Sequence, residues 1–375
     1  MGNPDFTSTS KASNPRLDAR WWWIGAALIT MLVGWFFKVN PYFCEVVYSR
    51  GIFLLLRAVW DYTLAWLPIP LLYMAILGLL IWAGWEIRKV ARRGFRYKGR
   101  FLIGHIALNL LAFTAAVYTL FYLSWGYNYH RRSVEDQLHI PEVQADSLGL
   151  VSEFERATEE LVAANLILGR NDSIPLSSSE LPDDLESQVR QLLTDTLEGL
   201  LYPTPGRVRA WRIQPSGFLM QLGASGIYIP FVGEGHYDAA LPACLWPEVM
   251  AHEMAHGYGF GDEGTCNFWS WLACSGSADP AIRYSANLSY WIEVARNYRK
   301  YFPEEYKDRR RQLPVSIRAD LAAINTAYRK YPGFFPETYN RVYDSYLKQQ
   351  GVKGGIKSYS RVIELRMGWE QVEEP

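Results

Sequence analysis

The first third of the chain alternates long uncharged stretches with short charged ones. The uncharged runs cover residues 21–37, 67–85 and 101–125. A helix needs about 20 predominantly apolar residues to cross the hydrocarbon core of a membrane, so these runs predict three transmembrane helices. The first run begins with three tryptophans, which suit a membrane interface, and no small-x-small cleavage site follows it. We therefore expect an uncleaved anchor, preceded by a short cytoplasmic tail of residues 1–20.

The segment between the first two runs, residues 41–66, is mixed in character. It carries charged side chains, among them Glu45, Arg57 and Asp61, between many apolar ones. This mixture is typical of a helix that lies in the membrane interface or enters the membrane only partly, and it argues against a further crossing. Residues 21–130 are thus predicted to form a helical membrane region with three spans.

Basic residues predict how the membrane region is oriented. Three precede the first span, namely Lys11, Arg16 and Arg20, and seven follow the second, namely Arg88, Lys89, Arg92, Arg93, Arg96, Lys98 and Arg100. Because loops rich in Lys and Arg stay in the cytoplasm, everything after about residue 126 is expected outside a bacterial cytoplasmic membrane. A basic cluster between two spans is typical of topology or of contact with anionic lipid. We therefore expect the lipid bilayer as a partner, and no nucleic acid.

Residues 131–375 have the pattern of one mainly helical, extracytoplasmic domain. Apolar residues recur at helical spacing in six stretches, which are 148–168, 183–201, 281–302, 316–331, 336–349 and 355–366. Two further stretches, 208–213 and 226–231, have the alternating and β-branched character of strands. The predicted fold is therefore an α-helical membrane region followed by an α+β domain that is mostly helical and contains a small sheet. Four cysteines are too few for a disulfide framework.

One short motif in this domain points to a chemical function. His252, Glu253 and His256 form the H-E-x-x-H arrangement of zinc hydrolases. The two histidines lie one helical turn apart on the same face, so both imidazoles can reach one metal ion. Glu253 lies beside them, where it can take a proton from metal-bound water. Pro247 suits the start of such a helix, and Gly257 suits its end.

A third ligand is expected shortly after the motif. Asp262 is predicted to be the N-cap of a new helix over residues 263–274, whose first turn would present Glu263 to the metal. Asn267 shares the face of Glu263 and is a candidate hydrogen-bond partner for a ligating histidine. Asp262, Glu234 and His236 are the alternative candidates for the third ligand. Cys266 can ligate zinc in principle, but we expect it to pack as a small apolar residue.

Residues around the motif are candidates for substrate binding. The strand 226–231 contains Pro230 where a sheet edge would tolerate it, and zinc peptidases commonly bind a peptide along such an edge. A purely structural strand is the alternative. The polar segment 233–238 is expected to be a turn that is close enough to line the cleft. Peptide hydrolysis also needs a donor for the oxyanion, and the candidates are Tyr228, Tyr359 and Arg361.

These motifs resemble those of known families. The metal motif with Glu263 and Asn267 is similar to the zincin metallopeptidases that use a glutamate ligand, particularly the integral-membrane ones, although Glu263 follows the motif at a shorter distance, as in metzincins. In those membrane zincins a Glu-x-x-Ala-Asp segment supplies the third ligand and its partner. A closer resemblance, carried also by residues 125–129, 226–231 and 359–362, is to an uncharacterised bacterial family of unknown function. That family has three membrane spans and a predicted zinc-peptidase domain, and Thr265 and Cys266 depart from its usual segment.

The residues and the resemblance together predict a membrane-anchored, zinc-dependent metallopeptidase that acts on protein or peptide substrates. One zinc ion per chain would be held by His252, His256 and Glu263, with Glu253 as the general base and Asn267 orienting a ligand. The rival expectation is a non-catalytic sensor or scaffold. Its zincin-like domain would bind a protein or envelope partner, and any metal would be structural.

Overall fold

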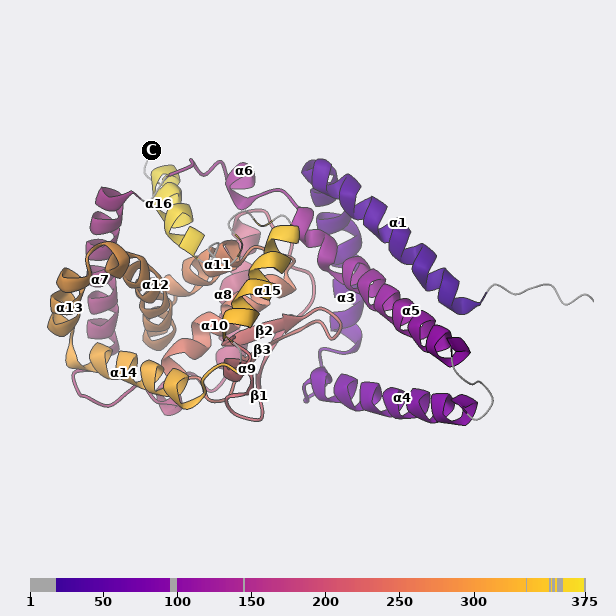
Figure 1. Ribbon diagram of the computed structural model, residues 1–375. Helices are drawn as coiled ribbons and strands as arrows, with labels where there is room; N and C mark the ends of the chain where they lie inside the picture. Colours follow the sequence, from indigo (N-terminus) through magenta and orange to yellow (C-terminus); the bar gives the residue numbers. More distant parts are fainter. Residues whose placement is uncertain are drawn as a thin grey trace, which may run out of the picture.

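The computed structural model describes residues 18–94, 100–143, 146–334, 336–350, 352, 355 and 360–373. It has two parts, a set of long apolar helices from the first third of the chain and a larger, mainly helical body with a three-stranded sheet (Figure 1). This arrangement confirms the predicted fold class. Some of the basic residues that predict the orientation lie outside the described residues, namely Lys11, Arg16, Arg96 and Lys98.

Three helices are long and apolar enough to cross a membrane, as predicted. They are α1 (Ala19–Val39), α4 (Leu71–Gly94) and α5 (Arg100–Ser124). Helix α4 begins later than expected because the helical conformation is disfavoured for a residue that precedes a proline, and Pro68 and Pro70 impose this just before it. Helices α1 and α5 pack along each other, whereas α4 stands apart from them over most of its length (Figure 1).

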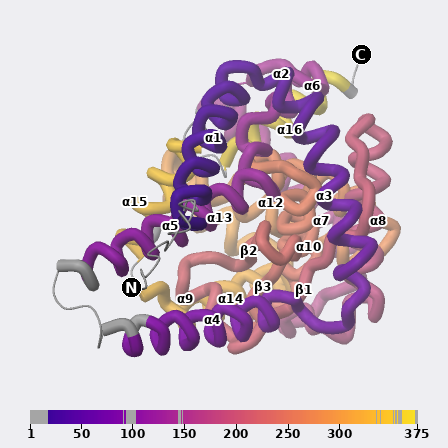
Figure 2. The backbone as a smooth tube through the Cα atoms, turned by 90° about the vertical axis from the view of Figure 1, so that its right-hand side faces the viewer, coloured from indigo at the N-terminus to yellow at the C-terminus, as the bar shows by residue number. Residues whose placement is uncertain are grey.

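The connection between α1 and α4 is helical over most of its length. It consists of α2 (Pro41–Phe43), the π-helix η1 (Cys44–Ile52) and α3 (Phe53–Thr63). Figure 2 shows α3 running from α2 to the start of α4 across the near face of the larger body. Three of its charged side chains are buried in ion pairs: Glu45 pairs with Arg131, and Arg57 pairs with Asp61. One side of this connection therefore packs against the larger body.

The larger body consists mostly of helices around an extensive hydrophobic core. The helices are η2 (Gly126–His130), α6 (Val134–Leu138), α7 (Ser147–Leu168), η3 (Ser178–Glu180), α8 (Leu185–Gly199), α9 (Phe218–Gln221), η4 (Ala243–Leu245), α10 (Trp246–Gly257), α11 (Glu263–Ser275), α12 (Pro280–Tyr301), α13 (Pro303–Gln312), α14 (Val315–Lys330), α15 (Pro336–Gln349) and α16 (Arg361–Glu373). The long helices α7 and α12 pack side by side, and α10 and α11 lie between that pair and the sheet (Figure 1).

Most of the predicted helices of this body are found close to their expected ends. The exceptions are instructive. The helix expected over 355–366 is instead α16, which begins at Arg361 and runs past Trp369, whose ring packs on Phe268 of α11. Helix α13 was not predicted, because it has no buried residue and therefore no apolar stripe by which a pattern could reveal it.

The sheet has three strands in the order β1-β3-β2. They are β1 (Arg209–Ile213), β2 (Gly226–Ile229) and β3 (Glu234–Asp238), with β1 parallel and β2 antiparallel to β3. Strand β2 is at an edge, as expected. The expectation that residues 233–238 form a turn is wrong, because they contain the central strand. Two polar side chains of β3 bond to groups outside the sheet: Asp238 accepts from the N–H groups of Gly217 and Leu219 at the start of α9, and Glu234 accepts from the N–H of Leu71, the first residue of α4.

Candidate metal centre

Two consecutive helices, α10 and α11, position the side chains of the H-E-x-x-H motif. Helix α10 has Pro247 in its first turn and ends at Gly257. Gly259 follows with a φ of 89°, a left-handed conformation that glycine adopts without strain, and the chain turns there. Asp262 caps α11 as predicted, because its carboxylate accepts from the N–H of Thr265 at 2.8 Å. The two helices are therefore joined by a short, well-defined turn.

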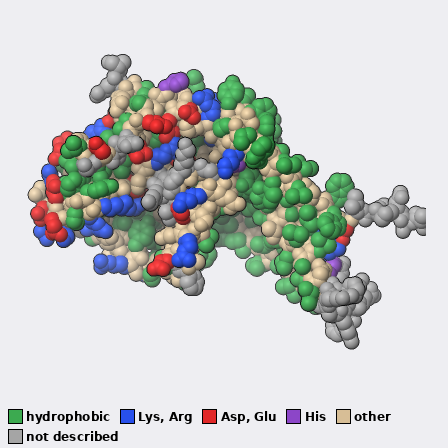
Figure 3. All heavy atoms as spheres, turned by 45° about the horizontal axis from the view of Figure 1, so that its top comes forward, with side chains coloured by type: hydrophobic (Ala, Val, Ile, Leu, Met, Phe, Trp, Pro, Cys, Tyr) green, Lys and Arg blue, Asp and Glu red, His purple; other side chains and the backbone are tan. Residues whose placement is uncertain are grey.

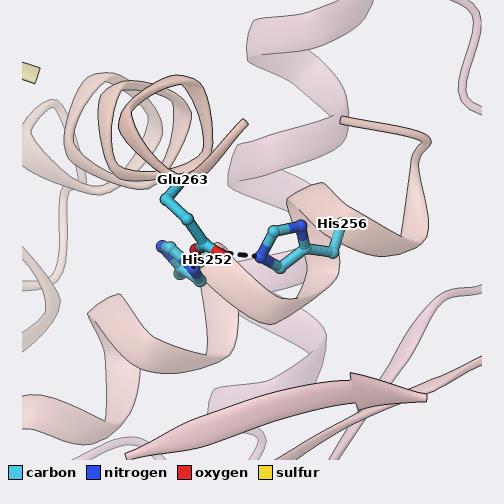
Figure 4. Close-up of side chains that lie close together, drawn as sticks. All are labelled: His252, His256 and Glu263. Atoms are coloured by element: carbon cyan, nitrogen blue, oxygen red, sulfur yellow. Dashed lines mark hydrogen bonds and ion pairs between the residues drawn. The ribbon is translucent and has the colours of Figure 1, made fainter. Parts of the chain in front are cut away.

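His252, His256 and Glu263 converge between these helices (Figure 4). Glu263 Oε2 lies 3.1 Å from His252 Nε2 and 3.3 Å from His256 Nε2. One ligand atom of each residue lies within 4.8 Å of the other two, and all three side chains are buried. Two imidazole nitrogens and a carboxylate oxygen form a donor set that suits Zn²⁺, so these residues fit one such ion.

In each histidine, the ring nitrogen that faces away from Glu263, Nδ1, makes a hydrogen bond that fixes the orientation of the ring. His252 Nδ1 donates to Asn267 Oδ1 at 2.7 Å, and His256 Nδ1 donates to the backbone oxygen of Phe260 at 2.8 Å. These bonds hold each ring through Nδ1 and direct each Nε2 toward Glu263, where Nε2 is the nitrogen that could bind a metal ion. Asn267 therefore has the position that its spacing from Glu263 predicts.

Glu253 is packed between α10 and the strands β2 and β3. A Cβ at Gly226 would collide with Glu253 Oε1, and one at Gly235 would lie 2.6 Å from Glu253 Cβ, so both glycines allow this close approach. The carboxylate is buried, and its Oε2 has no hydrogen-bond partner in the described part of the chain. Burial raises the pKa of Glu253 to about 7, an effect that the neighbouring histidines only partly offset.

Glu263 also receives a hydrogen bond from a residue that sequence reasoning missed. Tyr343, in α15, donates its hydroxyl hydrogen to Glu263 Oε1. Burial alone would raise the pKa of Glu263, but His256 and His252 outweigh it and hold this pKa well below its usual range. The amphipathic pattern of residues 336–349 could predict that one face of α15 is buried, but nothing in it indicates that this face meets the metal centre.

Two of the competing ligands lie beside the centre without pointing into it. Asp262 is occupied as the cap of α11 and in an ion pair with Arg361 at 2.7 Å. Cys266 Sγ lies 3.4 Å from His256 Nδ1, the nitrogen on the side of the ring away from Glu263. Cys266 is buried, in agreement with a packing role.

The other two competing ligands, Glu234 and His236, lie on the opposite face of β3. Gly235 between them faces Glu253, and because side chains alternate along a strand, its two neighbours point away from α10. Glu234 accepts from the N–H of Leu71 at 2.9 Å and thereby anchors the start of α4. Among the described residues, the potential metal ligands that converge are therefore those of Figure 4.

The three candidates for the oxyanion donor have different surroundings. Tyr228 faces the end of α10, and its hydroxyl accepts from Arg57 Nη1 at 3.0 Å. Arg361 forms an ion pair with Asp262, the N-cap of α11, and its Nε donates to Glu135 at 2.9 Å. Tyr359 lies outside the described residues.

The segment that follows α5 touches the metal helix. Trp125, directly after α5, donates from Nε1 to the backbone oxygen of His256 at 2.7 Å. Arg131 donates to the backbone oxygen of Gly259 at 2.8 Å and is paired with Glu45 of η1. Residues close to the candidate spans thus hold the C-terminal end of α10 in place.

Comparison with known proteins shows which family includes this architecture. The family described as "Protein of unknown function (DUF3810)" matches residues 48–367, which is well over half of the chain. The chain belongs to this family. Searches of curated proteins and of solved structures found no match.

The DUF3810 match begins within η1 and ends within α16. It therefore treats α3, α4 and α5 as one unit with the larger body, in agreement with the contacts between them. All the side chains of the candidate metal centre lie within the matched range. Because the family's function is unknown, the match supports the architecture and carries no activity with it.

Proposed function

We propose that the protein is a membrane-associated, zinc-dependent metallopeptidase. The observation that supports this most directly is the convergence of His252, His256 and Glu263, with both histidine rings held from behind. A zinc ion bound there would supply a Lewis acid and a water of lowered pKa. The donor set suits one ion per chain.

Two features favour a catalytic centre over a structural one. Structural zinc sites are closed by four protein ligands, whereas catalytic sites use three and keep one position open. Three potential ligands, and no fourth, converge here among the described residues. In addition, Glu253 brings a buried carboxylate next to them that a structural site would not require. Burial favours the uptake of a proton by this carboxylate and raises its pKa, as suits a general base.

The remaining groups have complementary roles in this proposal. Glu253 takes the proton of the attacking water and returns it to the leaving amine. Asn267 keeps His252 oriented. Tyr343, whose hydroxyl lies against Glu263, adds a candidate from the described residues for the donor that stabilises the oxyanion. Strand β2 has a free edge along which an extended peptide can bind.

The arrangement of the helices supports the proposed orientation in a bacterial cytoplasmic membrane. The ends of α1, α4 and α5 that carry Arg20, Arg92 and Arg100 point away from the larger body, and their opposite ends adjoin it (Figure 1). The ends of transmembrane helices that are rich in Lys and Arg stay on the cytoplasmic side of the membrane. The larger body, with its metal centre, would then lie on the outer side.

The experiment that tests the proposal measures metal content and peptide hydrolysis on the same samples. The full chain is purified without chelators, reconstituted with zinc and analysed by mass spectrometry, next to His252→Ala, Glu263→Ala and Glu253→Gln. We expect one zinc per chain in the wild type and in Glu253→Gln, and loss of zinc in the two ligand variants. Hydrolysis of a mixed peptide library should then require both the metal and Glu253.

Each outcome discriminates between the functional classes. A wild type that stays empty after reconstitution would contradict the metallopeptidase. One bound zinc without hydrolysis of any peptide would favour the sensor or scaffold. Tyr343→Phe adds a test of the oxyanion donor, since it should keep the metal and lower kcat more than it changes KM.

A further inference from the structure

Helix α3 is attached along one side to the sheet next to the metal centre. Arg57 Nη1 donates to the hydroxyl of Tyr228 at 3.0 Å and to the backbone oxygen of Gly233 at 2.7 Å. Trp60 Nε1 donates to the backbone oxygen of Val232 at 2.8 Å. The turn between β2 and β3, and the tyrosine that faces the end of α10, are therefore held by α3.

The charges on this inner side are fully engaged. Asp61 is paired with Arg57, its Oδ2 lying 2.7 Å from Arg57 Nε, and it accepts from the N–H of Arg207 at 2.8 Å. Arg209 Nη1 donates to the backbone oxygen of Ala65, just beyond the end of α3, at 2.7 Å. Both charged residues of α3 thus point into the larger body and leave the other side without charge.

The outer side of α3 is an uncharged apolar stripe. Leu55, Val59 and Tyr62 are exposed by 70, 65 and 76%, and Ile52, Leu56 and Trp66 next to them are exposed as well. Their spacing places them on one face of the helix. Single exposed apolar side chains are ordinary, but a contiguous row is a surface that something apolar covers.

This outer stripe is continuous with the surface of the candidate spans. The chain reaches α3 from the end of α1 and leaves it into the start of α4 (Figure 2). Figure 3 shows apolar side chains gathered over the part of the molecule that contains the candidate spans, whereas most of the charged side chains in this view lie over the rest. In Figure 1, α3 runs at a steep angle to α4 and α5, so it would lie along the surface of a membrane that those helices cross. A helix with these properties fits the interfacial zone.

The metal centre adjoins the same boundary through the end of α5. The ring of Phe231, at the turn after β2, lies 6.3 Å from that of Phe121 in the last turn of α5. The hydroxyl of Tyr122 donates to Gln350, which directly follows α15, at 2.6 Å. Together with the bond from Trp125 to α10, these contacts tie β2, α10 and α15 to the point where the third candidate span ends.

We propose that the outer stripe of α3 lies in the lipid interface, and that the metal centre consequently acts on peptide segments held at the membrane surface. The substrate class is thus the membrane-proximal part of an anchored protein or peptide, presented to the free edge of β2. This substrate class rests on the proposed metallopeptidase function, whereas the lipid contact of α3 stands apart from it.

The lipid contact can be tested without any activity. The four native cysteines are buried, so single cysteines at exposed positions can be labelled selectively with a small fluorophore. Leu55→Cys and Val59→Cys are compared with Leu166→Cys, which lies on α7 and is 78% exposed. In vesicles of phosphatidylethanolamine and phosphatidylglycerol that contain a lipid with a quencher near its headgroup, we expect quenching at 55 and 59 and none at 166. Fluorescence at 55 and 59 that is as unquenched as at 166 would overturn the inference.

The substrate class is tested with one peptide library in two forms, acetylated or palmitoylated at the N-terminus, on the full chain in the same vesicles. We expect faster cleavage of the palmitoylated form, on the order of tenfold, and a steady decline of this advantage as a flexible spacer moves the peptide away from the lipid. The double variant Leu55→Glu/Val59→Glu should lose the advantage and still cleave the acetylated form. Leu166→Glu, the matched control, should keep the advantage.

The outcomes separate failure of this inference from failure of the enzyme. Cleavage of both forms at equal rates, or an advantage that grows with spacer length, would overturn the substrate class while the metallopeptidase stands. Cleavage of neither form would overturn the metallopeptidase and with it the substrate class, whatever the fluorophores report. Quenching together with a spacer-dependent advantage supports both parts.

Discussion

Two regions build the candidate metal centre, and they differ in how far apart their partners lie along the chain. Within the helix pair α10 and α11, His252 and its partner Asn267 are separated by only 15 positions. The surrounding frame is assembled from distant segments: Tyr343 meets Glu263 across 80 positions, Trp125 meets His256 across 131, and Arg57 meets Tyr228 across 171. The ligands are thus a local feature, whereas the frame that orients and covers them is not.

This difference predicts that substitutions in the two regions have different effects. A change in the helix pair removes a proposed metal ligand, base or orienting bond, and the fold should survive it because the apolar side chains that α10 and α11 contribute to the core, such as Met254 and Trp269, are left in place. A change in the frame disturbs buried charges or the approach of strands to Glu253, so it affects stability or geometry while the ligands stay in place. Four substitutions test this difference, and they follow in order of decreasing expected effect.

Glu253→Gln should have the largest effect on hydrolysis. Loss of a general base typically lowers kcat by about 10²–10⁴, and the amide cannot accept the proton. Zinc content and the unfolding midpoint should stay near those of the wild type, as in the control Glu159→Gln, an exposed residue of α7. Steady-state kinetics and mass spectrometry on one preparation check this. Unchanged kcat in Glu253→Gln would show that the carboxylate is not the base.

Asp61→Ala tests the frame through stability. It leaves the Arg57 guanidinium buried without its partner, a loss that typically costs about 3–5 kcal/mol in the free energy of unfolding. The control is Glu304→Ala, which breaks an exposed pair with Lys307 and should cost less than about 1 kcal/mol. Unfolding in detergent, followed by tryptophan fluorescence, measures both. Equal midpoints for the two variants would mean that α3 does not stabilise the larger body.

Gly226→Ala tests the close approach of β2 to Glu253. The added Cβ would collide with Glu253 Oε1, and a displacement of about 1 Å in a catalytic group can lower the rate on the order of 10²-fold. Zinc binding should persist, because the ligands lie on other elements. Gly276→Ala, where a Cβ meets nothing within 4 Å, is the control. If both variants hydrolyse peptides at the same rate, β2 does not constrain the base.

Asn267→Ala should have the smallest effect of the four. Removing the acceptor behind His252 frees the ring, and such changes weaken metal affinity by about 10–100-fold. Asn267→Asp keeps an oxygen acceptor and should retain most of the affinity. Competition for zinc with a chromophoric chelator gives both values. An affinity in Asn267→Ala equal to that of the wild type would contradict the orienting role.

The sequence predicted the fold best where one face of an element is buried. The patterns of α12 and α15 predicted their bounds closely, and the three uncharged runs predicted the candidate spans. Helix α13 was missed because none of its residues is fully buried, and β3 was mistaken for a turn because two of its polar side chains, Glu234 and Asp238, have partners outside the sheet. Prediction thus failed where the partners of an element, rather than its own pattern, decide its structure.

The same rule applies to the metal centre. His252, Glu253, His256 and Glu263 could be proposed from spacing, because a helix places residues four apart on one face and the next helix begins only a few residues later. The sequence already favoured Glu263 over Glu234 and His236, and the sheet explains why these two do not converge on the centre, because its alternation turns their side chains away from α10. The sequence around the motif does not reveal that Tyr343 bonds to Glu263, or that Gly226 and Gly235 allow Glu253 to pack closely against the strands.

By itself, then, the sequence predicted most of the elements and the proposed ligand set, since both depend on periodicities of a few residues that local backbone geometry imposes. Only the tertiary structure decided that a motif more than a hundred positions after the third candidate span lies against the end of that span. It also decided that Arg57 and Asp61, charges in an apolar segment, pair with each other, while Arg57 bonds to Tyr228 of β2 and Asp61 to the backbone N–H of Arg207. The physical reason is that buried polar groups need partners, and long-range packing alone determines which partners they find.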